Sequence, residues 1–296
     1  MKENSQEQIA VIGHPISHSL SPVIHGAAFE HLGIQADYEK LDVPKEQVQA
    51  VIQRMREGNF RQFAVTIPSK EIALRSADSA SEIATYVGAA NTLTRMKDDT
   101  IHADNTDWIG VRDSLLEVGE WNSKKALVLG AGGAARGVIH ALKELGMNIS
   151  IKGSINNRPL SQAMKLAQHF GIRLVERGND YDLIINVTPL GLKKADDPEN
   201  INKTAFDKND LHEGMLVFDT VMNPLETRFL REAKEQGCHT IDGIRMLVYQ
   251  GIEQLRIWTD VVDPALSQRV GSEKQRLATI MREAALKKLG VTETTS

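Results

Sequence analysis

A glycine-rich turn is the feature that most constrains the fold of this chain. Segment 126–136 reads Ala-Leu-Val-Leu-Gly-Ala-Gly-Gly-Ala-Ala-Arg, so a short apolar run leads into Gly-x-Gly-x-x-Ala and then into a helical pattern. In this arrangement Gly130 permits a tight turn, Gly132 lets the backbone approach a pyrophosphate, and Ala135 is small enough for close helix-on-strand packing. The turn therefore predicts a dinucleotide site. The alternative is a tight strand-to-helix turn that binds nothing.

Apolar runs and helical patterns alternate around this turn. Short runs rich in β-branched residues predict strands, and the segments between them show the 3.6-residue period of helices. We expect strands at 126–129, 149–151, 183–187 and 216–219, and helices at 134–145 and 160–170. This order is typical of a doubly wound, Rossmann-type parallel sheet.

The first third of the chain shows a second alternation, of the βαβαβ kind. We expect strands at 9–12, 38–43 and 63–67, helices at 22–32 and 45–57, and a hairpin formed by 91–95 and 100–103. A helix from 107 to 118 follows, with Val111, Leu115 and Val118 on one face.

The pattern after Ile241 is helical to the end of the chain. Asp263-Pro264 is expected to open one last amphipathic helix, whose apolar positions include Leu277, Ile280, Met281 and Ala284. A length of 296 residues is typical of two domains. We expect these last helices to return to the first domain. Residues 1–106 and 243–296 would then form one discontinuous domain, and residues 107–242 the dinucleotide-binding domain.

Composition limits the class of protein and of partner. The formal net charge of -4 carries no long run of one sign, so nucleic acid is not expected and the partner should be a small molecule. No apolar stretch approaches the roughly 18 residues of a membrane span, and the polar segment 1–8 is unlike a secretory signal. The single cysteine, Cys238, fits the cytoplasm. Nine histidines without metal-ligand spacing predict no metal.

The stretch after the glycine turn indicates which nucleotide is bound. NAD sites usually carry an acidic residue about 20 residues further on, whereas NADP sites carry arginine nearby. No Asp or Glu lies between Leu145 and Val175, but Lys152, Arg158, Lys165 and Arg173 do. Arg158 is the best candidate for the 2′-phosphate because its guanidinium offers forked donors. The prediction is NADP, with NAD possible; alternatively these are solvated surface cations.

Two serines follow the first predicted strand. Ser19 and Ser21 precede a helix, at the strand end where open α/β sheets bind ligands. Their hydroxyls suit a polyol or an acid. Helix capping is the equally weighted alternative, and it fits Ser21 well.

Several blocks in one order closely resemble the shikimate dehydrogenase family over nearly the whole chain. They are Gly13–Pro22, Val65–Lys70, Gly88–Thr92, Asp104–Asp107, Gly130–Arg136, Asn157–Arg158, Asn186–Gly191, Asp219–Thr227 and Met246–Gly251. The resemblance implies an N-terminal α/β substrate domain plus a doubly wound Rossmann-type NADP domain, with a cleft between them. It also implies an oxidoreductase of aromatic amino acid biosynthesis that reversibly reduces 3-dehydroshikimate to shikimate.

The same resemblance implies roles for individual residues. Lys70 and Asp107 fall on the family's catalytic lysine and aspartate, and hydride transfer to a ketone does require a proton and a nearby positive charge. The implied substrate-binding positions are Ser19, Ser21, Thr66, Asn91 and Gln250. The implied cofactor-binding positions are Gly130, Ala131, Gly132, Gly133, Ala134, Ala135, Asn157, Arg158, Thr188, Met222 and Gly243.

The chain also departs from the family pattern. Ala64 stands where asparagine is usual, Trp108 where glycine is usual, and Pro159 where threonine follows the arginine. Met222 replaces a tyrosine whose hydroxyl helps to hold the substrate. One alternative is therefore a paralogue that acts on quinate or another cyclic hydroxy acid, or that uses NAD. A second is a dinucleotide-binding sensor without turnover. A homodimer is a hypothesis for the assembly.

Overall fold

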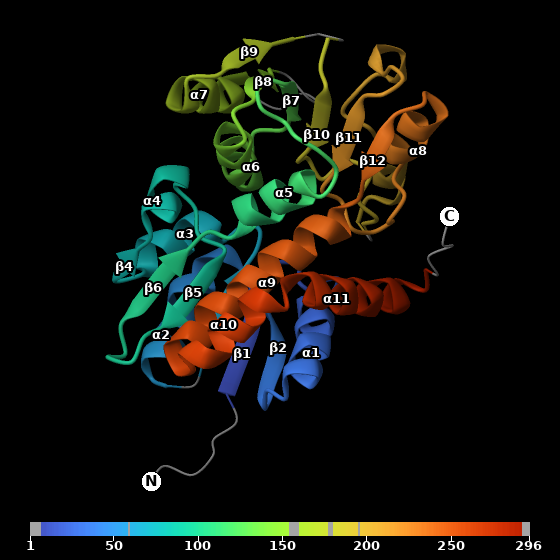
Figure 1. The fold of residues 1–296 in the computed structure, drawn as a ribbon. Coiled ribbons are helices and arrows are strands. Elements are labelled where there is room, and N and C mark those ends of the chain that lie inside the picture. The colour runs from blue at the N-terminus through green and yellow to red at the C-terminus, as the bar shows by residue number, and fades with distance from the viewer. Residues whose placement is uncertain (1–6, 59, 154–159, 177–179, 195, 292–296) are drawn as a thin grey trace. The chain divides into compact units, whose positions relative to one another are not determined.

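The computed structural model describes residues 7–58, 60–153, 160–176, 180–194 and 196–291. The chain forms two compact units (Figure 1). The first unit comprises residues up to Thr106 and from Val248 onward, and the second runs from Asp107 to Leu247. Each unit contains one six-stranded sheet.

The first unit is built on a mixed sheet in the order β2-β1-β3-β5-β6-β4. Strands β1, β2 and β3 are parallel, as the βαβαβ pattern predicts, and β5 and β6 form the predicted hairpin. The strands are β1 (Glu7–Gly13), β2 (Ala36–Asp42), β3 (Gln62–Val65), β4 (Ser79–Ala80), β5 (Thr92–Arg95) and β6 (Ile101–Asp104). The helices are α1 (Ser21–Leu32), α2 (Val48–Arg56), α3 (Lys70–Ser76), α4 (Glu82–Val87), α10 (Pro264–Ser272) and α11 (Lys274–Leu289), with a 3-10 turn at Lys45–Gln47.

The C-terminal helices complete the core of this unit. Helix α11 packs beside α1, although the two lie at opposite ends of the chain (Figure 1). Leu277 and Met281 of α11 are fully buried. Helix α9 (Gly243–Val262) begins in the second unit, and from Val248 onward it belongs to the first.

The second unit is the predicted doubly wound sheet, all parallel, in the order β12-β11-β10-β7-β8-β9. Its fully buried strands bear nearly continuous apolar runs, as parallel sheets do. The strands are β7 (Lys125–Leu129), β8 (Asn148–Lys152), β9 (Arg173–Val175), β10 (Leu183–Asn186), β11 (Leu216–Asp219) and β12 (His239–Ile241). The helices are α5 (Asp107–Leu116), α6 (Gly133–Glu144), α7 (Leu160–Phe170) and α8 (Arg228–Glu235), with 3-10 turns at Pro198–Asn202 and Lys208–Asp210.

Two local predictions were wrong. Val118 is exposed rather than buried beside Val111 and Leu115, because α5 ends at Leu116. The last amphipathic helix is two helices, which meet at Glu273. The Asp263 side chain does cap the first of them, accepting from the amides of Ala265 and Leu266.

Two properties of the described residues bear on membranes and metals. No helix there is long and apolar enough to cross a membrane. No group of three or more His, Cys, Asp or Glu side chains in those ranges is arranged to hold a metal ion. The cytoplasmic location stays a prediction.

Candidate functional site

In the first unit, the carboxyl ends of β1, β3 and β6 meet the amino end of β5. Backbone hydrogen bonds join these ends: the amide of Thr66 donates to Ile12 O (2.9 Å), that of Val65 to Asn91 O (2.7 Å) and that of Asn91 to Asp104 O (3.0 Å). Thr66 directly follows β3 and Asn91 directly precedes β5, so these hydrogen bonds hold both residues at one edge of the sheet. Open α/β sheets bind ligands at such an edge.

A buried hydrogen-bond network ties α9 to this edge. Asn91 Nδ2 donates to Thr106 Oγ1 (2.9 Å) and to Gln250 Oε1 (3.2 Å), and Thr106 Oγ1 donates to the Gln250 carbonyl (3.0 Å). Asn91 Oδ1 accepts from the Thr106 amide at 2.8 Å. The structure thus brings together Asn91 and Gln250, two predicted substrate positions. It adds Thr106, to which the sequence analysis assigned no role.

The helix-capping interpretation of Ser21 was wrong, whereas the Ser19 hydroxyl does accept from the first amide of α1. Ser21 is the first residue of α1, and the N-cap, Leu20, makes no side-chain capping hydrogen bond. Instead the Ser19 hydroxyl donates to Ser21 Oγ and accepts from the Ser21 amide, both at 3.3 Å. The Ser21 side chain is buried. Their role in substrate binding stays a prediction.

Lys70 is the first residue of α3 and is partly buried. Its carbonyl accepts from the amide of Ala90 (3.0 Å), so its backbone lies one residue from Asn91 at the same sheet edge. Asp107 is buried, begins α5 and directly follows Thr106 in the chain. The hydrogen bonds of Thr106 therefore hold the peptide bond that joins Thr106 to Asp107. The Lys70–Asp107 acid-base pair itself stays a prediction.

The glycine turn of the second unit has the backbone that its sequence requires. Gly130 has φ +121°, in the region that favours glycine, and a Cβ there would lie 2.9 Å from Thr188 Cγ2. A Cβ at Gly132 or Gly133 would meet no protein atom within 4 Å. The N-cap of α6, Gly132, has no side chain to cap the helix. Open space therefore lies beside the start of α6, where a helix N-terminus favours an anion.

The loop after β10 lies beside this turn, and the carboxylate of Asp219, the last residue of β11, joins it to the loop after β11. Its side chain is fully buried and accepts from Thr227 Oγ1 (2.6 Å), Asn186 Nδ2 (2.9 Å) and the Val221 amide (3.1 Å). Burial raises the pKa of Asp219 to about 6, although the hydrogen bonds oppose the shift. The sequence analysis assigned Asp219 no role, because a single acidic residue at the end of a predicted strand resembles an ordinary solvated residue.

The remaining predicted cofactor positions are placed as follows. Thr188 is buried beside Gly130, and Met222 is partly buried in the loop after β11. Gly243 packs against that loop, because a Cβ there would lie 2.5 Å from Val221 O and 2.6 Å from Thr220 O. Asn157, Arg158 and Pro159 lie outside the described residues.

The basic residues near the end of β8 differ in their surroundings. Lys152 Nζ donates to Ala205 O (3.1 Å) and lies 5.4 Å from the centre of the Phe206 ring. Lys165 of α7 and Arg173 of β9 are exposed. Lys152 is thus engaged by the protein. The role of Arg158 at the 2′-phosphate stays a prediction.

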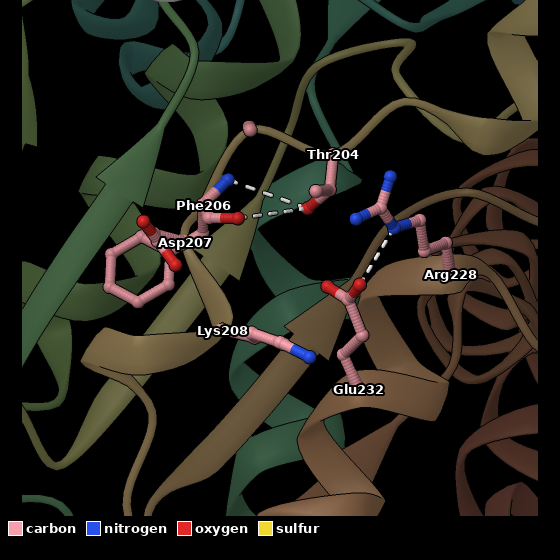
Figure 2. A pocket seen from close by; sticks show the side chains of 7 residues that line it. Thr204, Phe206, Asp207, Lys208, Arg228 and Glu232 are labelled. Carbon is pink, nitrogen blue, oxygen red and sulfur yellow. Dashed lines mark hydrogen bonds and ion pairs between the residues drawn. The ribbon is translucent and has the colours of Figure 1, made fainter.

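Figure 2 shows a cavity of about 420 Å³ elsewhere in the second unit. Arg228 Nε donates to Glu232 Oε1 at 2.7 Å on one side of it, and Lys208 extends toward it from the other. None of its lining residues is a predicted site residue. They are Thr204, Ala205, Phe206, Asp207, Lys208, Arg228 and Glu232.

Comparison with known proteins places the chain in a family. The model of the shikimate dehydrogenase substrate binding domain matches residues 11–93, and that of the shikimate 5'-dehydrogenase C-terminal domain matches residues 243–266. A curated relative from Methanocella arvoryzae, named shikimate dehydrogenase (NADP(+)), is 40% identical over 265 residues, covering 86% of this chain and 93% of the relative. The chain belongs to the shikimate dehydrogenase family. The resemblance noted in the sequence is confirmed.

Two solved shikimate dehydrogenases have similar folds. The enzyme of Thermus thermophilus, in complex with NADP(H) and shikimate, is 35% identical with a TM-score of 0.82, covering 95% of this chain and 99% of that one. The enzyme of Listeria monocytogenes, in complex with shikimate and NAD, is 28% identical with a TM-score of 0.73, covering 86% and 92%. These matches confirm the predicted α/β fold class with a Rossmann-type domain. Structures of the family thus contain either nucleotide.

Two departures from the usual shikimate dehydrogenase pattern lie in or against hydrophobic cores. Ala64, in place of the usual asparagine, is buried with Val11 and Ile16. Trp108 contacts the core around α6, where its ring meets His140 edge-on at 5.1 Å between centroids. The Arg112 guanidinium lies 4.7 Å from the centre of the indole. Trp108 thus packs α5, which begins at Asp107, against the helix that follows the glycine turn.

We expect Trp108→Ala to destabilise the second unit. Truncating a fully buried tryptophan costs roughly 3–5 kcal/mol, so about 3 kcal/mol is expected for the partly buried Trp108, which would also lose its cation–π contact with Arg112. A loss of this size corresponds to a Tm lower by roughly 6–12 °C, which calorimetry would measure. Trp108→Phe is the matched control and should retain most of the Tm. Equal Tm values for Trp108→Ala and wild type would contradict this account of the packing.

Proposed function

We propose that this protein is an NADP-dependent shikimate dehydrogenase that reversibly reduces 3-dehydroshikimate to shikimate. The observation that carries the proposal is the match to a relative of that name over 86% of this chain and 93% of the relative. A family structure with NADP(H) and shikimate, of the same fold over 95% of this chain, supports it.

The first unit supplies the groups that a small cyclic polyol would need. Ser19, Ser21 and Thr66 offer hydroxyls, and Asn91 and Gln250 offer amides that are already oriented by hydrogen bonds. Preorganised donors and acceptors of this kind bind hydroxyl and carboxylate groups with little loss of side-chain entropy. We propose these five residues as the substrate contacts.

The second unit fits a dinucleotide. The open side of Gly132 and Gly133 and the start of α6 would hold the pyrophosphate, and Thr188, Met222 and Gly243 would line the remainder. Bound NADPH supplies the hydride for reduction of the ketone. Arg158 and Asn157 are proposed to bind the 2′-phosphate.

Lys70 is proposed to transfer the proton of the reaction, and Asp107 to orient Lys70. In ketone reduction the Lys70 ammonium donates its proton to the carbonyl oxygen as negative charge develops there, and in the reverse direction the neutral amine accepts it. Asp107 orients the ammonium and a substrate hydroxyl. The proposal is supported by the position of Lys70 beside Asn91 and by the hydrogen bonds that hold Thr106, the residue before Asp107.

A steady-state assay with four reactant pairs tests the proposal. Purified protein should oxidise shikimate with NADP at a higher kcat/KM than shikimate with NAD, or quinate with either nucleotide. Preference for quinate or NAD would support the paralogue hypothesis, which the missing tyrosine at Met222 favours. Nucleotide binding with no turnover of either acid would support a sensor instead. Light scattering would test the homodimer, which stays a prediction.

A further inference from the structure

The carboxylate of Asp219 sets the orientation of a neighbouring amide. Asn186 directs Nδ2 toward Asp219 (2.9 Å), which leaves Asn186 Oδ1 to accept from the Thr188 amide (3.0 Å) and the Thr188 hydroxyl (2.7 Å). A carboxylate only accepts hydrogen bonds, so it excludes the flipped amide, in which two acceptors would face each other. The Asp219 carboxylate on one side and the Thr188 amide on the other therefore fix the orientation of the Asn186 side chain.

The same carboxylate also holds the loop after β11. It accepts from the amide of Val221 (3.1 Å), and the Thr220 hydroxyl donates to the Asn186 carbonyl (2.9 Å). Gly243 packs against the carbonyls of this loop. One buried carboxylate thus acts on the predicted cofactor position Thr188 through Asn186. Through the Val221 amide it also holds the loop that carries Met222 and that packs against Gly243.

The sheet order indicates which half of the nucleotide these positions face. In Rossmann-type sheets the residue that binds the adenosine ribose lies about 20 residues after the glycine turn, which here is the end of β8. Strands β10 and β11 lie on the opposite side of β7 from β8. Their loops therefore face the nicotinamide half.

We propose that Asp219 is a positioning residue for the nicotinamide half of the cofactor, acting through Asn186 and the loop after β11. This inference rests on the proposed function. Burial disfavours the charge of Asp219 and raises its pKa, and the hydrogen bonds from Thr227, Val221 and Asn186 oppose that effect. A purely apolar turn could close the same strand ends, but it would not orient Asn186.

Exchanging the side chains of Asp219 and Asn186 tests the proposal. In Asp219→Asn the new amide can turn either an acceptor or a donor toward Asn186, so Asn186 is no longer held from that side, and the Kd for NADP should rise about tenfold, the size expected for one or two misdirected hydrogen bonds. Asn186→Asp places two carboxylates in contact and should weaken NADP binding at least as much. The double variant Asp219→Asn/Asn186→Asp restores one carboxylate and one amide in contact, and its Kd should return to within about threefold of wild type.

The matched control is Asp182→Asn. Asp182 directly precedes β10, so it lies at the amino end of that strand, whereas Asp219 lies at the carboxyl end of β11. Asp182 accepts from the Lys125 amide (2.7 Å), so its replacement should lower Tm and leave the Kd for NADP unchanged. Kd is measured by fluorescence titration with NADP alone, at a temperature where each variant is folded by circular dichroism. If Asp219→Asn does not fold, the double variant carries the test.

A wild-type Kd for Asp219→Asn, or a double variant as weak as the single ones, would overturn the positioning role. Because the titration contains no shikimate, failure of the wild-type protein to oxidise shikimate would count against the proposed substrate and not against the role of Asp219.

Discussion

Lys70→Met is expected to lower kcat for shikimate oxidation by about a thousandfold. A positioned acid or base contributes roughly 10²- to 10⁴-fold, and the ammonium additionally stabilises charge on the substrate oxygen. Methionine keeps the length of the side chain but can neither donate nor accept the proton. Lys70 is partly buried at the start of α3, so folding should be little affected.

Steady-state rates with shikimate and NADP provide the measurement. The control is Lys97→Met, an exposed lysine in the β5–β6 hairpin of the same unit, which should retain wild-type kcat. The effect should fall mainly on kcat, with KM for NADP within about threefold of wild type, because the proton is transferred only in the chemical step. A Lys70→Met enzyme with more than about a tenth of wild-type kcat would exclude Lys70 as the proton donor.

Local signals predicted the central part of each sheet. The apolar run before Gly130 and the small residues after it allow few other conformations, and the structure has β7, a left-handed glycine and α6 there. The edge strands of the second sheet gave no such signal. Strands β9 and β12 are only three residues long, so neither alternation nor a buried run marks them. Each forms by pairing with its neighbour in the sheet, β9 with β8 and β12 with β11.

The sequence analysis also missed some helix boundaries. Gly271 lies in the last turn of α10, two residues before the break at Glu273, but the sequence analysis did not use it as a stop signal because the helical periodicity continues into α11. Helix α8 did carry a start signal that the sequence analysis did not use: the Thr227 hydroxyl accepts from the amide of Leu230.

The site was predictable where a motif concentrates its residues, and less so where distant segments meet. Asn91 and Gln250 were predicted through the family resemblance alone. Thr106 received no role, because its hydroxyl donates to a carbonyl 144 residues away. The same holds for Asp219, whose partner Asn186 lies 33 residues earlier in the chain. Contacts of this kind depend on strand order, which a local pattern does not contain.

Arg158→Ala is expected to lower kcat/KM for NADP by roughly 10- to 100-fold while changing kcat/KM for NAD by less than about threefold. Hydrogen bonds to a charged group contribute about 1.5–3 kcal/mol, and alanine removes the forked donors proposed for the 2′-phosphate. NAD lacks that phosphate, so it loses little. The comparison of the two nucleotides therefore isolates the phosphate contact from any general effect on folding.

The neighbouring proline makes the size of this effect informative. Pro159 has no backbone N–H and no hydroxyl, so it removes donors that a threonine could direct at the phosphate, and Arg158 should carry more of the binding energy. Pro159→Thr should then raise the preference for NADP over NAD, whereas Lys165→Ala, at an exposed position of α7, should not change it. Equal losses with both nucleotides in Arg158→Ala would mean that Arg158 does not read the phosphate. Lys152, the last residue of β8, would be the next to replace, although its ammonium already donates to Ala205 O.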